Sequence, residues 1–343
     1  VRTTTFPPAP PLSVTVIIPF RNEAAHLPFL IEALQRQTYA RAEFLFVDDH
    51  STDGGQSVVG SLTNGDIRFR RLLNRGEGKK AAITTAVHAA TSEIMVTTDA
   101  DCVMGSDWLE TLLRGFHHDR VMMVLGPVVL RHEGTWWSKC QQLEFLSLVG
   151  SAAAGVGIGY PFMCNGANLA YRKKAFEAVG GYADNMHVAS GDDEFLMRAL
   201  VSRSSNGVCF QVDKNSIVTT TGSATVKAFW FQRLRWAAKW KHNSLPMRAL
   251  ALGVLGVHAV FIVCMVMVVG SHDDTVQLLA GGVLLVKLLG EWALLKPIAV
   301  HWGLPWHTPS FITLQFIHSI YIVITGLFSN FMPNTWKGRA ISK

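Results

Sequence analysis

The sequence predicts an α/β fold with a doubly wound sheet, followed by membrane helices. Strand-like segments at 14–19, 43–47, 67–73 and 93–97 alternate with helical segments in the first third of the chain. The run at 14–19 is almost continuously apolar, as in parallel strands buried on both faces. After Pro246, three apolar stretches follow, each long enough to cross a membrane core of about 30 Å as a helix.

The helical segments between these strands have apolar residues at helical spacing. They are expected over 22–37, from 51 onward and over 79–90. The pattern is less regular after Asp101. Helices are expected there over 107–116, 136–151, 174–179, 192–202 and 228–241, and strands over 121–130 and 165–171.

These elements divide the chain into a globular part and a membrane part. We expect a Pro-rich spacer at 1–13, a globular domain over 14–227, an interfacial amphipathic helix at 228–246, membrane helices within 247–331 and a basic tail over 332–343. The chain does not begin with Met, so we expect further residues upstream.

The composition favours a membrane protein, because only 16% of the 343 residues are charged and 49% are hydrophobic. The apolar stretches are 247–270, 276–300 and 309–331, and a buried helical core is the alternative interpretation. Lys287 and Glu291 lie four residues apart in the second stretch, so they must face protein or each other. The sequence is compatible with either two or three helices that cross the membrane.

Basic residues set the expected orientation. Those before the first stretch (Lys239, Lys241 and Arg248) favour a cytoplasmic globular domain, whereas three full crossings would place the basic tail residues (Lys337, Arg339 and Lys343) outside. The net charge of +6 suits anionic lipid headgroups. No basic run is interleaved with aromatic residues, so nucleic acid is not expected as a partner. The scattered cysteines indicate a reduced, cytosol-facing domain and no zinc site (Cys102, Cys140, Cys164, Cys209 and Cys264).

Asp99 and Asp101 follow the strand at 93–97 and are separated by one small residue. Alternate residues of an extended chain point the same way, so both carboxylates project from the C-terminal end of the strand. Ligands bind at that end of open α/β sheets. Two neighbouring carboxylates repel each other unless a cation neutralises them, and Mg²⁺ or Mn²⁺ bridging to a diphosphate would do so. An isolated Asp-x-Asp is more often a turn or a cap.

Other motifs accompany this pair in order along the chain. They are Ile18-Pro19-Phe20-Arg21-Asn22-Glu23, Val47-Asp48-Asp49-His50-Ser51-Thr52-Asp53, Gly76-Glu77-Gly78-Lys79-Lys80, Asn165-Gly166-Ala167-Asn168, Gly191-Asp192-Asp193-Glu194 and Gln232-Arg233-Leu234-Arg235-Trp236. Over about 14–240 the chain resembles the family 2 glycosyltransferases, which have a Rossmann-like nucleotide-diphospho-sugar transferase domain of the GT-A type. It is most similar to their membrane-bound branch, which includes cellulose, chitin and hyaluronan synthases and ceramide glucosyltransferase.

The resemblance implies a role for each motif. The residues expected to bind the nucleotide-sugar donor are Pro19, Asn22, Glu23, Asp48, Asp49, Lys79, Asp99 and Arg235. Asp101, with Asp99, is expected to bind the metal. Asp193 aligns with the catalytic base and Asp192 is the second choice. Trp236, Gln232 and Asn168 are expected to contact the acceptor.

Ordinary structural roles compete at several positions. Asp53 is expected to cap a helix and Lys80 to lie in a solvated basic turn. The helix at 136–151, with Glu144, is expected to lie on the membrane and guide the acceptor. The histidines at 50, 187 and 242 show no metal-ligand spacing and are expected to be ordinary polar residues.

The resemblance implies an inverting, metal-dependent transfer of a sugar from a nucleoside-diphosphate sugar, UDP-linked by preference, to a membrane lipid. The protein would be an integral protein of a bacterial-type cell membrane with its catalytic domain facing the cytoplasm. The alternatives are a processive polysaccharide synthase with a glycan acceptor, and a non-catalytic subunit that binds nucleotide-sugars. A nucleotidyltransferase is disfavoured, because Pro19 to Glu23 stand where a glycine-rich basic loop would be needed.

Overall fold

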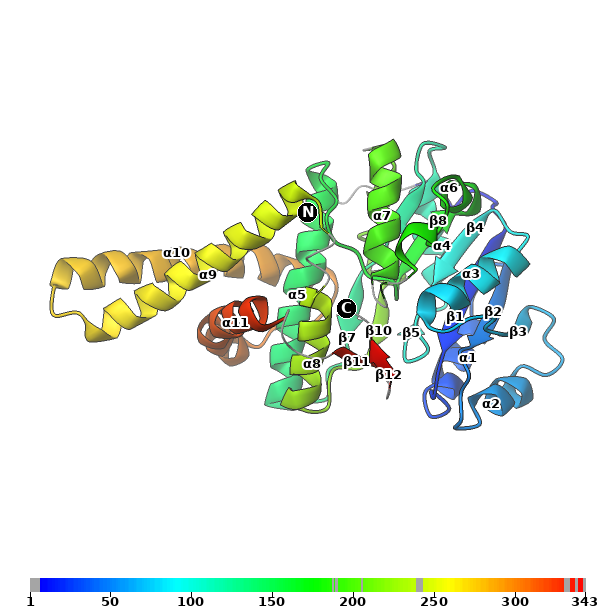
Figure 1. The fold of residues 1–343 in the computed structure, drawn as a ribbon, viewed down its shortest axis with the longest axis horizontal. Helices are drawn as coiled ribbons and strands as arrows, with labels where there is room; N and C mark the ends of the chain where they lie inside the picture. Colours follow the sequence, from blue (N-terminus) through cyan, green and yellow to red (C-terminus); the bar gives the residue numbers. More distant parts are fainter. Residues whose placement is uncertain are drawn as a thin grey trace. The chain divides into compact units, whose positions relative to one another are not determined.

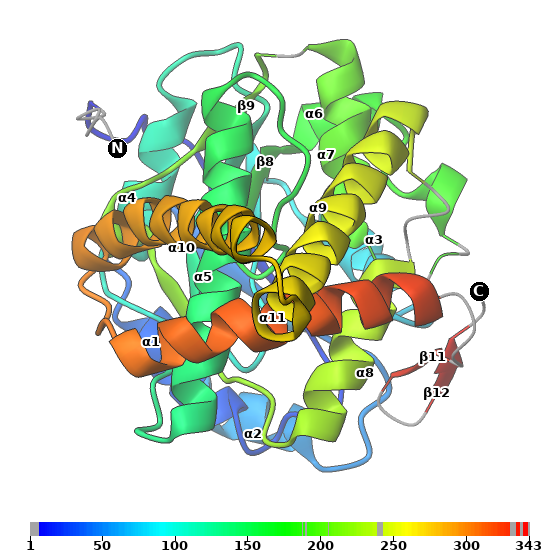
Figure 2. The same ribbon diagram turned by 90° about the vertical axis from the view of Figure 1, so that its left-hand side faces the viewer.

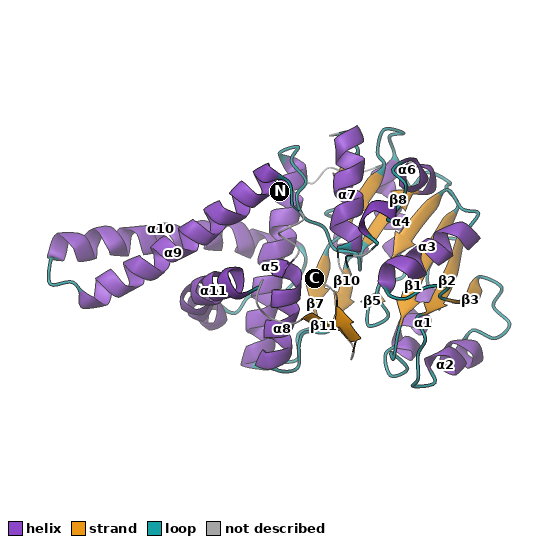
Figure 3. Ribbon diagram, in the orientation of Figure 1, coloured by secondary structure: helices purple, strands orange, loops and turns teal. Residues whose placement is uncertain are grey.

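The computed structural model describes residues 7–186, 188, 191–204, 206–238, 243–329, 334–336 and 339–341. The chain forms two compact units. The first, called the sheet unit, comprises Arg2–Arg131 and Ser151–Thr221, and the second, the helical unit, comprises His132–Gly150 and Gly222–Lys343. Most of the described strands belong to the sheet unit (Figure 3), whereas the short hairpin β11 (Asn334–Trp336) and β12 (Arg339–Ile341) belongs to the helical unit.

A seven-stranded sheet with the order β3-β2-β1-β4-β8-β6-β9 forms the centre of the sheet unit. Strands β3, β2, β1, β4 and β8 of this sheet are labelled in Figure 1. Its strands are β1 (Val14–Phe20), β2 (Ala42–Asp48), β3 (Phe69–Leu73), β4 (Ile94–Thr97), β6 (Met123–Leu125), β8 (Leu169–Arg172) and β9 (Val208–Phe210). β1 pairs in parallel with β2 and β4, and β2 pairs in parallel with β3. The C-terminal ends of β1, β2 and β4 therefore share one edge.

The sheet is mixed beyond β4, because β8 pairs antiparallel with both β4 and β6. The α/β prediction is confirmed, and the parallel pairing extends over the four strands that alternate with helices. The helices of this unit are α1 (Leu27–Gln35), α2 (Gly55–Leu62), α3 (Lys79–Ala89), α4 (Trp108–Leu113), α6 (Lys173–Ala178) and α7 (Asp192–Arg203). Short 3-10 helices cover Arg114–Phe116, Ala183–Asn185 and Lys214–Ser216.

The single strand expected over 121–130 is two strands in different sheets. β6 belongs to the large sheet, and β7 (Val128–Leu130) joins β5 (Val103–Met104) and β10 (Val218–Thr220) in a small sheet with the order β5-β10-β7. The break falls at Gly126-Pro127. A Cβ at Gly126 would lie 2.3 Å from the side-chain nitrogen of Asn168, so only glycine allows this close approach.

The helical unit contains α5 (Trp136–Gly157), which begins in it, and α8 (Val226–Ala237), α9 (Leu245–Gly270), α10 (Asp274–His301) and α11 (Thr308–Phe328). In Figure 2, α11 crosses α5 and α8. Pro246 and Pro309 stand in the first turns of α9 and α11, where a missing N–H costs no helical hydrogen bond. Asp273 begins α10 by accepting hydrogen bonds from the amides of Thr275 and Val276.

Helices α9, α10 and α11 are long and apolar enough to cross a membrane, judged by length and composition. This confirms the expected apolar stretches as helices. Lys287 Nζ lies 2.8 Å from Glu291 Oε1 and donates a hydrogen bond of 2.7 Å to Gln315 of α11. The prediction that this charged pair faces protein or each other is therefore confirmed.

Several sequence expectations fall outside the described residues. They concern His187, Lys239, Lys241, His242, Lys337, Lys343 and the part of the basic tail other than 334–336 and 339–341.

Candidate active site

The loop after β1 is joined to the loop after β2 by hydrogen bonds to main-chain amides. Asn22 adopts a left-handed backbone conformation (φ 54°), and its side-chain oxygen accepts a hydrogen bond of 2.8 Å from the Thr52 amide. Asp53 accepts hydrogen bonds from the amides of Ala24 and Gly55, the first residue of α2. The structural role expected for Asp53 is thus confirmed, although Gly54 occupies the N-cap position itself.

Asp48 and Asp49, at the end of β2, are both buried. Asp48 Oδ1 accepts a hydrogen bond of 2.9 Å from the Ser51 amide and so closes the turn. Asp49 Oδ1 accepts hydrogen bonds from Asn74 Nδ2 (2.7 Å) and from the Gly78 amide (3.0 Å). Asp49 therefore holds the loop that leads into α3. Gly78 has φ 87°, a conformation that favours glycine, and directly precedes Lys79.

Lys79 connects two of the acidic motifs. Its Nζ donates a hydrogen bond of 2.6 Å to Asp99 Oδ1 and lies 3.5 Å from Asp192 Oδ2. Burial disfavours the charge of Lys79, but the attraction of Asp192 and Asp99 outweighs burial and raises the pKa of the ammonium group. Lys79 thus stays charged beside carboxylates contributed by the end of β4 and by the start of α7.

Asp193 is oriented by main-chain donors. Its Oδ2 accepts a hydrogen bond of 3.0 Å from the Gly166 amide, and its Oδ1 accepts one of 2.8 Å from the Glu194 amide. A Cβ at Gly166 would lie 3.1 Å from Asp192 Oδ2 and 3.3 Å from Lys79 Nζ. Gly166 therefore allows Lys79, Asp192 and Asp193 to gather at one point, a role that its glycine identity in the Asn165–Asn168 motif could have indicated.

Asp101 lies next to this group and is half-buried. Its Oδ2 accepts a hydrogen bond of 3.0 Å from the hydroxyl of Thr220 in β10. Burial, and then repulsion from Asp99, raise the pKa of the Asp101 carboxyl, although the Thr220 hydrogen bond acts against this. Thr220 gave no signal in the sequence, because only the small sheet brings it beside Asp101.

The Asp99–Asp101 pair fits a metal that is shared with substrate oxygens. Two carboxylates whose mutual repulsion raises a pKa would be stabilised by a divalent cation. Among the described residues, no group of three or more His, Cys, Asp or Glu is arranged as a complete metal cage. Mg²⁺ and Mn²⁺ are commonly held by one or two carboxylates together with phosphates, so a complete cage is not needed.

Two predicted side chains have partners that the sequence did not indicate. Asn168 is fully buried, and its side chain bonds the carbonyls of Pro127 and Ser216 and the indole nitrogen of Trp108. These bonds give Asn168 a structural role in place of the expected acceptor contact, because its donors and its oxygen are engaged inside the protein.

Lys80 is not the solvated residue that was expected. It is 4% exposed, and its Nζ donates hydrogen bonds to the carbonyls of Asn185 (2.7 Å) and Val188 (2.8 Å). It also lies 4.7 Å from the ring centroid of Phe195 in α7. Lys80 thus anchors the segment that precedes the acidic turn, because buried carbonyls need donors.

The structure places the remaining predicted site residues in two parts of the fold. They are Pro19, Glu23, Gln232, Arg235 and Trp236. Pro19 stands near the end of β1, and Glu23 Oε2 lies 2.6 Å from His26 Nδ1. The other three are in α8 of the helical unit. Buried charged residues of that unit include Glu144, Lys287 and Arg233, to which the sequence assigned no role of its own.

Comparison with known proteins supports this description. Residues 15–180 match the sequence model of Glycosyl transferase family 2. The succinoglycan biosynthesis protein ExoA of Rhizobium meliloti is 28% identical over 248 residues, which cover 68% of this chain and 72% of ExoA. A poly-beta-1,6-N-acetyl-D-glucosamine synthase of Staphylococcus aureus is 22% identical over 227 residues, covering 65% of this chain and 53% of the synthase.

A solved structure shows a similar fold. The mannosyltransferase PcManGT from Pyrobaculum calidifontis, in complex with GDP-Man and Mn2+, aligns with a TM-score of 0.57 at 20% identity. The alignment covers 95% of this chain and 88% of the mannosyltransferase.

The fold and these matches define the class of protein: this chain is a glycosyltransferase with a GT-A-like fold. Its residues 15–180 match the sequence model of Glycosyl transferase family 2, and three long apolar helices follow them in the chain.

Proposed function

We propose that this protein transfers a sugar, with inversion at the anomeric carbon, from a UDP-sugar to a membrane lipid. The observation that carries the proposal is the contact of Lys79 with Asp99 and Asp192, which joins the nucleotide side of the site to the acidic turn. Relatives named as an N-acetylglucosaminyltransferase (24% identical) and a poly-N-acetylglucosamine synthase support a nucleotide-sugar donor.

Asp193 is the catalytic base in this proposal. It accepts the proton of the acceptor hydroxyl as that oxygen attacks the anomeric carbon, and the diphosphate leaves from the opposite side in one displacement. The amides of Gly166 and Glu194 hold the carboxylate in position. Asp192 contacts Lys79 and is better placed to orient that lysine than to take the proton.

The negative charge that develops on the leaving diphosphate must be stabilised. Lys79 supplies one positive charge, and Asp101, with Asp99, would hold Mg²⁺ or Mn²⁺, which supplies further neutralisation when bound. We assign Pro19, Asn22, Glu23, Asp48 and Asp49 to the nucleotide side. Asp48 and Asp49 would act indirectly: their buried carboxylates accept hydrogen bonds from main-chain amides and so fix the loops that would surround the nucleotide.

The residues of α8 are assigned from the resemblance. Arg235 would contact the diphosphate, since a guanidinium binds phosphate oxygens with two parallel hydrogen bonds. Trp236 and Gln232 would contact the acceptor, since an indole ring offers a flat apolar surface to a sugar or a lipid headgroup.

A lipid acceptor is favoured over a growing polysaccharide. A polar glycan crosses the hydrocarbon only inside a closed ring of helices, and the described chain contributes three candidate spans. The basic Arg248 in the first turns of α9 supports a globular part on the cytoplasmic side.

The test is a donor panel of radiolabelled UDP- and GDP-sugars, incubated with membranes that contain the full chain. One organic-extractable labelled product is expected from a UDP-sugar. A high-mass polymer would instead identify a synthase, and label from GDP-sugars alone would contradict the UDP assignment. Absence of both transfer and donor hydrolysis across the panel would identify a non-catalytic subunit.

A further inference from the structure

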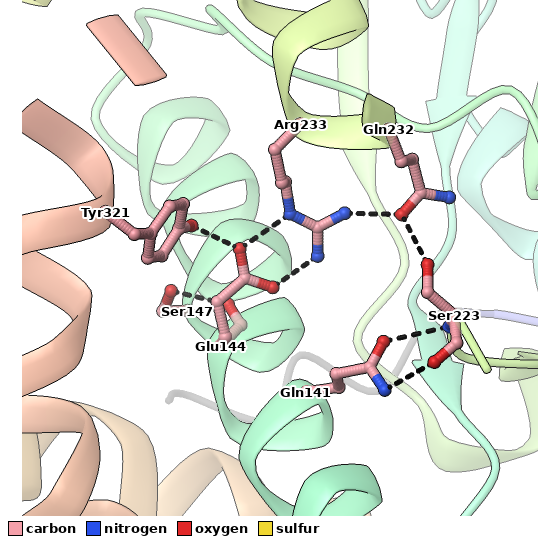
Figure 4. A network of polar contacts seen from close by, with 7 residues as sticks. All are labelled: Gln141, Glu144, Ser147, Ser223, Gln232, Arg233 and Tyr321. Atoms are coloured by element: carbon pink, nitrogen blue, oxygen red, sulfur yellow. Dashed lines mark hydrogen bonds and ion pairs between the residues drawn. The ribbon is translucent and has the colours of Figure 1, made fainter. Parts of the chain in front are cut away.

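The carboxylate of Glu144 joins three helices of the helical unit (Figure 4). Glu144 belongs to α5, and its Oε1 accepts hydrogen bonds from Arg233 Nε of α8 (2.9 Å) and from the hydroxyl of Tyr321 of α11 (2.6 Å). Its Oε2 accepts a further hydrogen bond from Arg233 Nη2. The pair is bidentate, and the side chains of Glu144 and Arg233 are only 2% and 6% exposed.

The guanidinium of Arg233 is held on every side. Its remaining nitrogen, Nη1, donates a hydrogen bond of 2.6 Å to Gln232 Oε1. Its Cζ lies 4.4 Å from the ring centroid of Phe229 and 4.3 Å from that of Trp236. Phe229, Arg233 and Trp236 are spaced four and three residues apart, so they share one face of α8.

Burial disfavours the charge of Arg233. The attraction and hydrogen bonds of Glu144 outweigh burial and raise the pKa of the guanidinium, so Arg233 stays charged. A buried ion pair of this kind gains little stability over apolar residues of the same volume. The pair instead fixes the relative orientation of the Glu144 and Arg233 side chains, because the two parallel hydrogen bonds form in only one arrangement.

The same network fixes Gln232. Ser223 donates its hydroxyl to Gln232 Oε1 at 3.5 Å, and Gln141 of α5 bonds both the amide and the carbonyl of Ser223. Trp236 is also 6.3 Å, centroid to centroid, from Phe145 of α5. Ser223 and Arg233, which precede Trp236 in the chain, are thus tied to α5, and α5 is tied to the candidate membrane helix α11.

We propose that Glu144, Arg233 and Tyr321 form a clamp that sets the orientation of the Trp236 ring, and that all three are positioning residues for the acceptor. This role rests on the proposed function, in which Trp236 contacts the acceptor. The clamp transmits the position of α11 to that ring: Tyr321 holds the carboxylate, the carboxylate holds Arg233, and the guanidinium lies over Trp236.

The first test uses Tyr321→Phe, which removes one hydroxyl and keeps the ring that packs 5.7 Å from Phe229. Ser147→Ala is the matched control, because the Ser147 hydroxyl bonds the main-chain carbonyl of Glu144 and not its carboxylate. The full chain is assayed with vesicles of total lipid from the expression host as acceptor. Tyr321→Phe is expected to raise the apparent KM for vesicle lipid about tenfold, as for loss of one hydrogen bond to a charged group, with an unchanged donor KM. Ser147→Ala is expected to change neither.

A double-mutant cycle separates orientation of Trp236 from general stabilisation. In a Trp236→Leu background, Tyr321→Phe should change the lipid KM less than about twofold, because the ring on which the clamp acts is gone. A full, additive effect in that background, or an equal rise in donor KM, would overturn the proposal. If Tyr321→Phe does not fold, Glu144→Gln, which keeps the volume of the side chain, is put through the same cycle.

A spectroscopic measurement tests the clamp without activity. The protein is labelled with 5-fluorotryptophan in lipid nanodiscs, and the Trp236 fluorine resonance is assigned by its loss in Trp236→Phe. The resonance should move in Tyr321→Phe and stay in place in Ser147→Ala. An unmoved resonance in Tyr321→Phe overturns the clamp. Absence of transfer by the wild-type chain, with the resonance moved as expected, overturns the proposed function alone.

Discussion

The Nζ atom of Lys79, the first residue of α3, lies 3.5 Å from Oδ2 of Asp192, the first residue of α7. Side chains from the first residues of the two helices therefore meet, although the helices are far apart in the sequence. The N-termini of helices favour negative charge, so the start of α7 suits its three acidic residues, Asp192, Asp193 and Glu194. Lys79 adds the positive charge that allows Asp99 to approach them.

Replacing Lys79 by Met should weaken nucleotide-sugar binding. The variant loses a charged donor and leaves Asp99 and Asp192 without their common counter-charge. We expect donor affinity, measured by calorimetry, to fall about tenfold to a hundredfold, in line with loss of a hydrogen bond between charged groups. Lys174→Met removes a lysine that is exposed on α6 and should leave affinity unchanged. Equal affinities in both variants would contradict the placement of Lys79.

Asp193→Asn should abolish transfer while nucleotide binding stays close to wild type. The amide keeps the size of the side chain, but it cannot take a proton from the acceptor. Transfer is measured with radiolabelled donor, and binding with the nucleoside diphosphate and Mn²⁺. Asp184→Asn, at an exposed acidic position, is the control. Turnover near the wild-type rate in Asp193→Asn would show that another group is the base.

Asp101→Asn should raise thermal stability in EDTA and remove the stabilisation by Mn²⁺. Because burial and Asp99 raise the pKa of Asp101, the folded state binds its proton more readily than the unfolded state does. The ionised carboxylate therefore destabilises the metal-free protein at neutral pH, and this loss is relieved as the pH falls through the folded-state pKa. Unfolding curves with EDTA and with Mn²⁺ test this. A variant that is still stabilised by Mn²⁺ as much as wild type would exclude Asp101 as the ligand.

Lys80→Met should loosen the segment before α7. Methionine keeps the length of the side chain but removes the ammonium group that donates to the carbonyls of Asn185 and Val188, a loss of about 1–3 kcal/mol. The Asn185 carbonyl keeps one donor, because it also accepts a hydrogen bond from the Val188 amide. Hydrogen exchange of the peptide that contains both residues is expected to quicken, and kcat should fall. Lys174→Met, which changes an exposed lysine, is again the control and should alter neither exchange nor kcat. Unchanged exchange in Lys80→Met would mean that other contacts hold this segment.

Glu144→Ala should be strongly destabilising, because it leaves the buried charge of Arg233 unpaired. Breaking a buried ion pair from one side costs about 3–5 kcal/mol. The double variant Glu144→Met/Arg233→Met is expected to recover most of the thermal stability, since apolar residues replace both charges, and to remain defective in transfer. A double variant as unstable as Glu144→Ala would show that packing, and not the unpaired charge, dominates the loss.

Much of the fold was predictable from local patterns. The apolar runs and helical spacings gave the four strands and three helices of the first hundred residues, and the acidic pairs at 48–49 and 99–101 follow parallel strands that end at one edge. The Gly126-Pro127 pair is a turn signal inside the apolar run at 121–130 and could have indicated the break, whereas the close approach of Asn168 that requires glycine at 126 is visible only in the tertiary structure. The hydrogen bond from Thr220 to Asp101 could not be predicted from the sequence, since β10 comes from a distant part of the chain.

The sequence by itself determined the class of fold, the apolar helices and the order of the acidic motifs, because these depend on residue types at short spacing. Only the tertiary structure decided which charged side chains from distant parts of the chain meet. Successive helix residues point about 100° apart, so Lys79 faces the carboxylates while Lys80 bonds main-chain carbonyls. For the same reason Arg233, two residues before Arg235, is the arginine that pairs with Glu144, and no local pattern distinguishes the two.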